Sequence, residues 1–344
     1  MRAFTIIGPR KGLVQEIADP VPGVGEVLIR PSHVGICGTD SHIFAGRFAT
    51  TFPLVNGHEF SGTVEEVGPG VAEWRPGDRV TADPTLYCGS CYRCLRRQGN
   101  HCDRWGAIGD THPGALAEYV VVPARNVYRV EEHESLSDAA FTEPLACVVS
   151  GIERLRPAPG DRALVFGAGP VGCLMAQMLA LSPTADIVVV DVSEKKLAVA
   201  RTLGARAAFR ANASLGEQLH ERSRGRKFDI VVDCSGQPEV MEGLFDHAAP
   251  NARIMFFGVA SPTAEIRINP FDVYHNDWQI LGSMAINHTF QQARDLISSG
   301  RVAVHPLLTR RVALEDVAEI LSSPKPPADL KVMVEPNGPM EDAS

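Results

Sequence analysis

Two groups of potential metal ligands stand out in the first third of the chain. The first group consists of Cys37 and His58, with the carboxylate of Glu59 directly after the histidine. Zinc takes thiolate and imidazole ligands, and a carboxylate can complete three protein ligands while a fourth position stays open for water or substrate. A metal with an open position can polarise an oxygen that binds there. These residues therefore predict a catalytic metal site.

The second group is a run of four cysteines with the spacing C-x2-C-x2-C-x7-C, namely Cys88, Cys91, Cys94 and Cys102. Four thiolates complete a tetrahedral zinc site without an open position, and such a site folds a loop instead of performing chemistry. An iron–sulfur cluster also suits this run, but we favour zinc beside the first group. The first residues show no secretory leader, so we expect the reducing cytoplasm, where clustered thiols indicate metal and not disulfides.

A glycine-rich turn forms a third motif, and it fits the pattern G-x-G-x-x-G through Gly167, Gly169, Pro170, Val171 and Gly172. It follows an apolar strand pattern and opens a helical one, which favours a pyrophosphate site at the helix N-terminus over an unrelated tight turn. Asp191 ends the next predicted strand and can accept hydrogen bonds from both adenosine ribose hydroxyls. Its charge disfavours a 2′-phosphate, so NAD is preferred over NADP, although Lys195 and Lys196 soften this preference.

The segments around these motifs change character near residue 150. Before it, short β patterns alternate with turn signals, at 3–7, 26–31, 60–67 and 79–82. After it, apolar strands alternate with helices, which is typical of a doubly wound parallel sheet. We expect strands at 163–166, 187–190, 230–233, 253–257 and 279–283, and helices at 171–181, 194–203, 241–249, 290–299 and 314–322.

Composition limits the classes of protein that fit. A chain of 344 residues with 44% hydrophobic and 22% charged residues is an ordinary globular chain of about two domains. Its 41 acidic and 33 basic residues give a net charge of −8, which argues against nucleic-acid binding. The uncharged run 163–181 contains glycines and a proline, so we interpret it as a buried strand, turn and helix and not as a membrane span.

Taken together, the motifs resemble the zinc-dependent medium-chain alcohol/polyol dehydrogenase family over roughly residues 1–335. The most specific element is Gly57-His58-Glu59 with Gly62, Gly68 and Val71 in register. The resemblance implies a GroES-like, partly open β-barrel catalytic domain over 1–148 and 286–344 that carries two zinc ions. It also implies a Rossmann NAD-binding domain over 149–285, with the active site in the cleft between the domains.

Within that family, Cys37 and His58 resemble the two constant ligands of the catalytic zinc. The third ligand position falls on Glu143, where simple alcohol dehydrogenases have cysteine and the sorbitol, xylitol, arabinitol and butanediol branch has glutamate. In the polyol members Glu59 can also be the direct ligand, so both glutamates remain candidates. Thr39 and His42 resemble a proton relay.

The resemblance also assigns supporting residues. Asp40 resembles the carboxylate that holds the zinc-bound imidazole. We expect further cofactor contacts from Val171, Lys196, Val259 and Ser283. The family forms homotetramers or dimers through the edge strands of its nucleotide domains, and we expect a tetramer first and a dimer second.

The substrate is less well specified. Two carboxylates near the metal favour a polyol oxidised with NAD, but Ala285 stands where sorbitol dehydrogenases tend to place an arginine, and the loop 111–116 departs from the common polyol pattern. A vicinal-diol or secondary-alcohol dehydrogenase of the butanediol type is the alternative, and a threonine dehydrogenase fits less well. A non-catalytic zinc- and nucleotide-binding relative is the alternative from another class, because fold alone does not guarantee chemistry.

Overall fold

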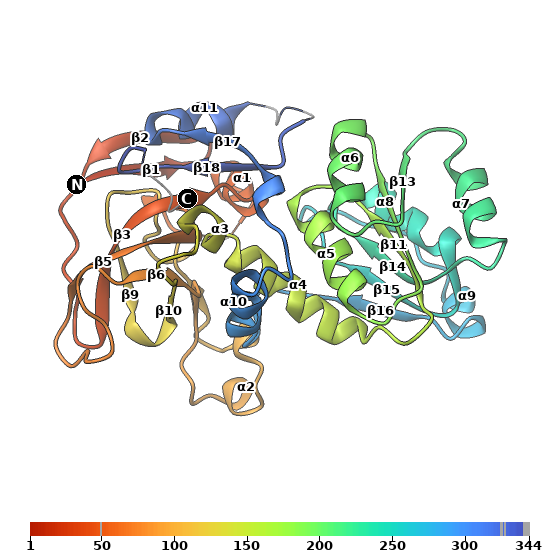
Figure 1. The fold of residues 1–344 in the computed structure, drawn as a ribbon, viewed down its shortest axis with the longest axis horizontal. Helices are drawn as coiled ribbons and strands as arrows, with labels where there is room; N and C mark the ends of the chain where they lie inside the picture. The colour runs from red at the N-terminus through yellow and green to blue at the C-terminus, as the bar shows by residue number, and fades with distance from the viewer. Residues whose placement is uncertain (49, 324–325, 327, 340–344) are drawn as a thin grey trace. The chain divides into compact units, whose positions relative to one another are not determined.

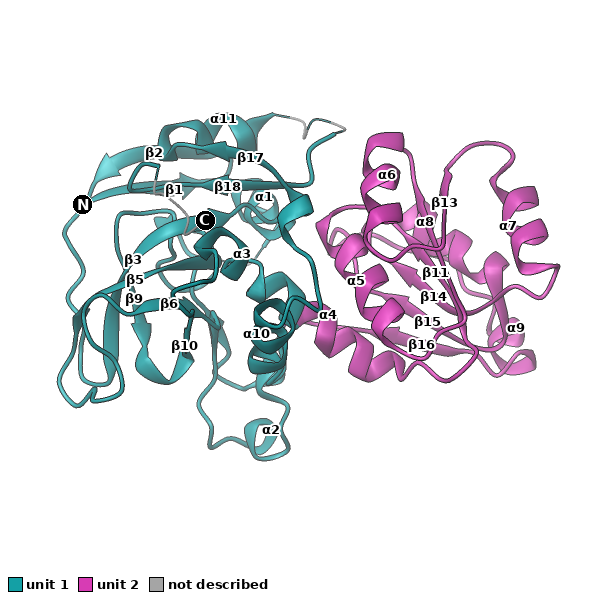
Figure 2. Ribbon diagram, viewed as in Figure 1, with its two compact units in different colours: residues 1–146, 286–344 teal, residues 147–285 magenta. Residues whose placement is uncertain are grey.

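The computed structural model describes residues 1–48, 50–323, 326 and 328–339 (Figure 1), and the chain divides into two units. Unit 1 comprises residues 1–146 and 286–344, and unit 2 comprises residues 147–285 (Figure 2). The chain thus leaves unit 1 within helix α4 (Thr142–Leu155) and returns to it after residue 285. Residues 340–344 of the expected catalytic segment 286–344 lie outside the described residues.

Unit 1 is built on two sheets. The larger has the order β10-β6-β5-β3-β18-β17, with β9 also pairing with β3, and the smaller has the order β2-β1-β4. The strands are β1 (Arg2–Gly8), β2 (Lys11–Glu16), β3 (Glu26–Gly35), β4 (Leu54–Val55), β5 (Glu59–Val67), β6 (Arg79–Ala82), β9 (Val120–Pro123), β10 (Val127–Arg129), β17 (Leu308–Val312) and β18 (Lys331–Val334). A further two-stranded sheet pairs β7 (Thr85–Leu86) with β8 (Gly106–Ala107).

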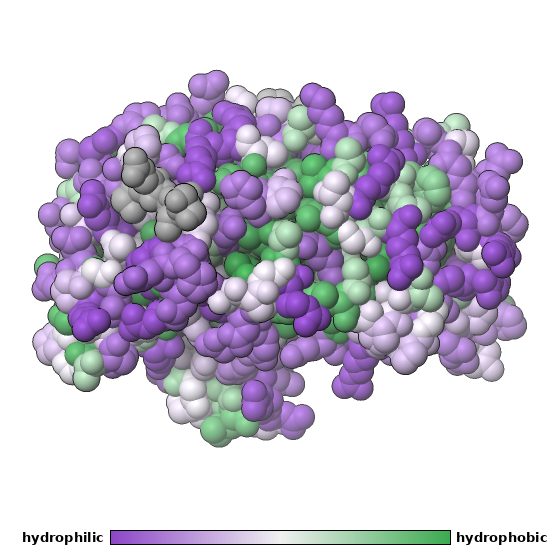
Figure 3. Space-filling view, viewed as in Figure 1, coloured by the Kyte–Doolittle hydropathy of each residue, from purple (hydrophilic) through white to green (hydrophobic). Residues whose placement is uncertain are grey.

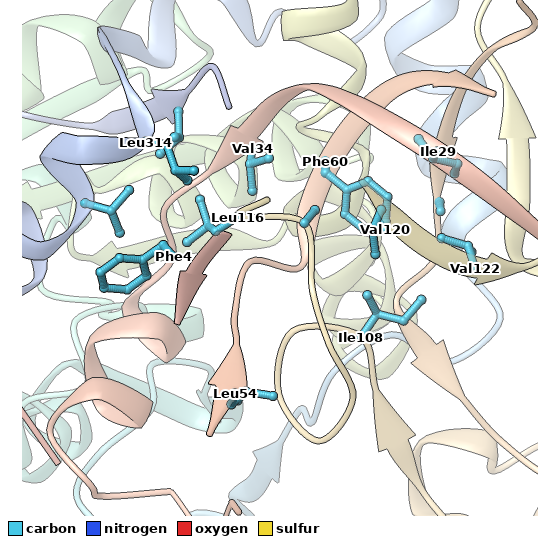
Figure 4. Close-up of a cluster of buried hydrophobic side chains, with 14 of the residues drawn as sticks. Phe4, Ile29, Val34, Leu54, Phe60, Ile108, Leu116, Val120, Val122 and Leu314 are labelled. Carbon is cyan, nitrogen blue, oxygen red and sulfur yellow. The ribbon is translucent and has the colours of Figure 1, made fainter. Parts of the chain in front are cut away.

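A buried apolar cluster holds these sheets together (Figure 4). Phe4 from β1 and Phe60 from β5 are almost fully buried within it, and Leu314 comes from the returning segment. Burying a side chain of this size contributes about 1.5–3 kcal/mol relative to its exposed state. The cluster therefore fixes β3 and β5, the two strands that adjoin the predicted metal ligands.

Short helices follow the strands of unit 1. They are α1 (Gly38–Phe44), α2 (Tyr92–Leu95), α3 (Leu136–Ala139), α10 (Phe290–Ser298) and α11 (Val317–Ser322). Cys37 caps the N-terminus of helix α1, and its backbone N–H donates to Asp40 Oδ2 at 2.8 Å. A carboxylate in the first turn satisfies a backbone donor that the helix itself leaves unpaired. The N-terminus of α1 is therefore anchored by Asp40.

Unit 2 contains a six-stranded parallel sheet with the order β13-β12-β11-β14-β15-β16. Its strands are β11 (Arg162–Phe166), β12 (Asp186–Asp191), β13 (Ala207–Arg210), β14 (Phe228–Asp233), β15 (Ala248–Phe256) and β16 (Gln279–Gly282). Its helices, besides most of α4, are α5 (Pro170–Leu181), α6 (Glu194–Thr202), α7 (Leu215–Ser223), α8 (Pro238–Gly243) and α9 (Pro270–His275). The strand order reverses at β11, which places a topological switch point between β11 and β14.

The structure corrects one predicted helix. The prediction of a helix over 241–249 is wrong in extent, because α8 ends at Gly243, a 3-10 helix covers Leu244–His247, and β15 has begun at Ala248. Pro238 occupies the first turn of α8, where a proline starts a helix without losing a hydrogen bond. The segment predicted at 314–322 is likewise a 3-10 turn over Leu314–Asp316 followed by α11.

The uncharged run 163–181 is divided into β11, the glycine turn and α5, as the sequence predicts. Within the described residues, the structure contains no helix that is both long and apolar enough to cross a membrane. Hydrophilic residues dominate the face of the molecule drawn in Figure 3.

Candidate metal and nucleotide sites

The first predicted ligand group converges in unit 1. One ligand atom each from Cys37, His58 and Glu59 lies within 4.8 Å of the other two, although Cys37 and His58 are 21 positions apart. The antiparallel register of β3 and β5 sets Gly35 opposite Glu59. A Cβ at Gly35 would lie 2.2 Å from Glu59 Oε2, so the close approach of this carboxylate requires glycine. A partly buried thiol beside a buried imidazole and a buried carboxylate fits a zinc ion.

A buried lysine that the motifs do not predict contacts this group. Lys331 Nζ lies 2.5 Å from Glu59 Oε2 and 3.3 Å from the backbone oxygen of Ile36. Burial lowers the pKa of Lys331, but the charges of Glu59 and Cys37 outweigh burial and raise it above its ordinary value. The ammonium therefore stays charged and neutralises one carboxylate beside the predicted metal ligands.

Glu143 occupies the first turn of α4 and is 9% exposed. Within the described part of the chain, the group of atoms within 4.8 Å contains Glu59 and not Glu143. Glu143 also raises the pKa of Lys331, so it contributes to the same electrostatic environment. The structure thus brings one candidate glutamate next to Cys37 and His58 and sets the other farther from them.

Two carboxylates face one nitrogen of the His58 ring. Asp40 Oδ1 lies 3.6 Å and Asp110 Oδ1 lies 3.5 Å from His58 Nδ1. Burial raises the pKa of Asp40 to about 6, and burial also raises the pKa of Asp110. Burial lowers the pKa of His58, yet the charges of the two aspartates outweigh it and raise that pKa well above 6.5. Protons therefore compete with a metal for His58 in the metal-free chain.

The predicted relay residues lie on α1. Thr39 and His42 are three positions apart, a spacing that puts two side chains on the same face of a helix. Both are partly buried. Burial lowers the pKa of His42, and the positive charge of Arg47 lowers it further. His42 is therefore a neutral base at neutral pH.

The four predicted cysteines also converge, in a loop that contains α2. The Sγ–Sγ distances are 3.9 Å for Cys88–Cys94, 3.5 Å for Cys91–Cys94 and 3.9 Å for Cys91–Cys102. Backbone N–H groups of Cys91 and Arg104 donate to the sulfurs of Cys88 and Cys102. Such donors stabilise thiolates, the form that binds a metal. The arrangement fits a closed tetrahedral zinc site.

In unit 2 the glycine motif forms the turn between β11 and α5. Gly167 has a φ of +101°, and a Cβ at Gly172 would lie 1.7 Å from the Gly167 backbone oxygen, so both positions require glycine. Gly169 caps α5 without a side-chain hydrogen bond, and Pro170 begins the helix. Backbone N–H groups at such an end are available to an anion, as a pyrophosphate site requires.

The other predicted cofactor residues follow the carboxyl ends of neighbouring strands. Asp191 ends β12, and its carboxylate accepts from the backbone N–H groups of Ala168 at 2.7 Å and Ser193 at 2.8 Å. Val259 follows β15 and Ser283 follows β16, so both belong to the edge of the sheet that carries the glycine turn. Val171 and Lys196 are partly buried near the starts of α5 and α6.

Two family models and many known proteins match the chain. The family model described as "Alcohol dehydrogenase GroES-like domain" matches residues 23–132, and the one described as "Zinc-binding dehydrogenase" matches residues 170–299. A D-altritol 5-dehydrogenase of Agrobacterium fabrum is 32% identical over 96% of this chain and 98% of its own length. A D-arabinitol dehydrogenase 1 of Uromyces fabae is 31% identical over 98% and 97%, respectively.

Solved structures give the same result. One similar structure is described as a zinc-binding dehydrogenase of Sinorhizobium meliloti 1021 bound to NADP. It superimposes with a TM-score of 0.93 at 29% identity and covers 97% of this chain and 99% of its own. The GroES-like and Rossmann-type folds predicted for the two parts of the chain are confirmed by these similarities.

Proposed function

The chain belongs to the zinc-dependent medium-chain alcohol/polyol dehydrogenase family, and we propose that this dehydrogenase transfers hydride between a secondary alcohol of a sugar alcohol and NAD. The observation that carries the proposal is the convergence of partly buried Cys37 with buried His58 and Glu59 in one group. The printed activities of the relatives, on D-altritol and D-arabinitol, support a polyol and do not favour the vicinal-diol alternative.

Cys37 and His58 would hold the catalytic metal, with Glu59 or Glu143 as the third protein ligand. When bound, zinc supplies a Lewis acid for the substrate hydroxyl and the nicotinamide supplies the hydride acceptor. Lys331 offsets the charge of Glu59, so a divalent cation would compete with this ion pair if Glu59 were the third ligand. His58, Glu59 and Lys331 are buried and Cys37 is partly buried, which limits the water around these charges and strengthens each electrostatic interaction in the site.

The alcohol proton must leave the buried site as the carbonyl forms. We assign the transfer to Thr39, whose hydroxyl both accepts and donates, and then to His42 on the same helix α1. Neutral His42 accepts the proton and releases it to solvent.

The pH dependence of polyol oxidation follows from this assignment. Because the pKa of His42 is lowered from 6.5, its basic form is present at neutral pH, and activity should fall only as the pH drops through that lowered pKa. Arg47→Gln removes a nearby positive charge, raises the pKa of His42 and should move the acid limb of kcat to higher pH. Arg301→Gln, at an exposed arginine elsewhere in unit 1, is the control. An acid limb that does not move in Arg47→Gln would contradict the relay role.

A substrate panel tests the proposed reaction. NADH formation is measured with hexitols, pentitols, tetritols, vicinal diols, simple secondary alcohols and L-threonine. We expect turnover of a hexitol or pentitol with a kcat/KM at least about tenfold above that of any diol, a difference of about 1.4 kcal/mol in transition-state binding. Turnover confined to diols or simple alcohols would contradict the polyol assignment. Silence across the panel with zinc and NAD bound would indicate the non-catalytic alternative.

We propose NAD as the preferred cofactor, and Asp191 carries this choice. A 2′-phosphate near its carboxylate, which two backbone donors hold in place, would meet a like charge. Asp191→Ser should lower the NAD:NADP ratio of kcat/KM by about 10- to 100-fold, or roughly 1.4–2.8 kcal/mol. Glu217→Gln, at an exposed carboxylate on α7, should leave the ratio unchanged. An unchanged ratio in Asp191→Ser would contradict this role, and the NADP-bound neighbour makes the comparison informative.

We further propose two zinc ions per chain, the second held by Cys88, Cys91, Cys94 and Cys102. No disulfide joins any of the described cysteines, which suits a reducing compartment such as the cytoplasm.

We also propose that a second copy of the chain covers the edge strand β16, giving a dimer that pairs into a tetramer. β16 pairs with β15 and is mostly exposed, and Phe271 and Tyr274 of the neighbouring segment α9 are 62% and 79% exposed. An exposed strand edge beside aromatic side chains is a surface that assembly would bury. The double variant Phe271→Ser/Tyr274→Ser should shift the mass in solution, measured by light scattering, towards the monomer. An unchanged mass would contradict this interface.

A further inference from the structure

The loop after β8 brings a carboxylate to the metal-facing histidine that the glycine, cysteine and histidine motifs do not predict. Asp110 Oδ1 lies 3.5 Å from His58 Nδ1, and Asp110 is 16% exposed. Both atoms are buried and neither has a hydrogen-bond partner in the described structure. Buried polar atoms are normally hydrogen-bonded, so a buried N–H donor and a buried carboxylate oxygen that face each other without other partners can form a hydrogen bond with a small shift.

Asp40, the carboxylate expected to hold the ring, is already engaged. Its Oδ2 accepts from the Cys37 backbone N–H at 2.8 Å, and its Oδ1 accepts from Asn56 Nδ2 at 3.1 Å. Asp40 Oδ1 also lies slightly farther from His58 Nδ1, at 3.6 Å. The contacts of Asp40 thus anchor the N-terminus of α1 and the segment before His58.

We propose that Asp110 is a positioning residue that accepts the Nδ1–H of His58 when Nε2 binds the metal. The inference rests on the proposed function, since it takes His58 to be a zinc ligand. A ligating imidazole needs its free ring N–H bound to an acceptor, because that bond fixes the tautomer and the orientation of the ring. Asp110 supplies an acceptor with no competing donor, and Asp40 supports the same ring from the helix side.

The backbone holds Asp110 in place independently of its carboxylate. The turn is closed by hydrogen bonds from Asp110 N to Ala107 O at 3.2 Å and from Gly109 N to His112 O at 2.8 Å. Thr50 Oγ1 donates to the Asp110 backbone oxygen at 2.6 Å. Asp110→Asn therefore removes the charge and one acceptor oxygen while these contacts remain.

The loop also packs directly on the segment that carries the histidine. A Cβ at Gly109 would lie 2.6 Å from the backbone oxygen of Gly57, the residue before His58. A change in this loop is therefore transmitted to the metal ligand over a single backbone contact.

The experiment compares zinc retention in the full-length wild type, Asp110→Asn, Asp110→Glu and the control Glu132→Gln, which changes an exposed carboxylate of the same unit. The rate of zinc loss to a chelator, the zinc content per chain and the visible spectrum of the Co²⁺-substituted site are measured. We expect Asp110→Asn to weaken binding of the catalytic zinc by about 10- to 100-fold. Asp110→Glu, which keeps the carboxylate, should retain more zinc, and the four-cysteine zinc should be unaffected.

Zinc retention in Asp110→Asn within twofold of the wild type would overturn the proposal. So would an equal loss of thermal stability in the metal-free forms of Asp110→Asn and Asp110→Glu, since that would indicate a purely structural turn. If Asp110→Asn does not fold, the Co²⁺ spectrum of Asp110→Glu tests the proposal. A displaced His58 ring changes the ligand field of the metal, so a spectrum identical to that of the wild type in every respect, together with unchanged zinc retention, would overturn the proposal. Failure of the proposed function is distinguishable, since it would appear as a wild type that loses zinc but not activity.

Discussion

Replacing His58 with alanine should leave a chain that binds one zinc ion and has lost dehydrogenase turnover by at least about a thousandfold. A Lewis acid at the reacting oxygen is worth several kcal/mol, and about 4 kcal/mol corresponds to a factor of one thousand in rate. His58 is one of three ligand residues in the group, and Cys37 with one glutamate offers too few ligands for a stable zinc site. Metal analysis and NADH formation measure the two effects.

The matched control is His133→Ala, which removes an exposed histidine of the same unit and should keep two zinc ions and full activity. Cys94→Ser should lose the four-cysteine zinc and keep the zinc at His58. The loop around α2 should then become open to proteolysis. Activity and two zinc ions retained in His58→Ala would show that the catalytic metal lies elsewhere.

The second large effect concerns folding. Lys331→Met should lower the free energy of unfolding by about 3–5 kcal/mol, because it leaves the buried carboxylate of Glu59 without its partner. The two side chains are 4% and 1% exposed, so water cannot replace the lost contact. Urea unfolding of the zinc-stripped protein measures the change, because a zinc ion bound to Glu59 would itself compensate the carboxylate. The exposed Lys11 provides a matched lysine, and Lys11→Met should change stability by less than about 0.5 kcal/mol.

The double variant Lys331→Met/Glu59→Gln separates charge from packing. It removes the unpaired charge along with the lysine, so most of the lost stability should return, although zinc affinity can fall. A single variant that is as stable as the wild type would contradict the buried ion pair. A double variant as unstable as the single would show that lost packing of the lysine stem, and not the unpaired carboxylate, causes the effect.

Much of the fold could be predicted from the sequence because its signals are local. The apolar strands of unit 2 lie in the interior of a parallel sheet, so they appear as uninterrupted runs such as Val188–Val190. The glycine turn is specified by backbone geometry at Gly167 and Gly172. Helix α7 was not predicted, because it has few apolar residues besides Leu215 and Leu219 and therefore shows little apolar periodicity. The end of the predicted helix 241–249 failed because residue types that suit a helix also suit the 3-10 turn and strand that follow.

The sequence predicts candidate site residues where one short motif carries the chemistry. Cys37, His58 and Glu59 lie in such motifs, and the structure brings them together. Lys331 and Asp110 were not predicted, because the role of each depends on a contact with a residue far away in the sequence. A signal existed for Lys331, since it is a lone charge in the apolar segment 330–334, whereas Asp110 looks like an ordinary Gly-Asp turn.

The most direct test of the central claim is NADH formation from NAD and the best polyol of the panel before zinc chelation, after it, and after zinc is returned. The account predicts that activity falls with the catalytic zinc and recovers when zinc is added back, while NAD still binds to the stripped protein through the Gly167 turn. Full polyol turnover in protein shown by metal analysis to contain no zinc would contradict the account.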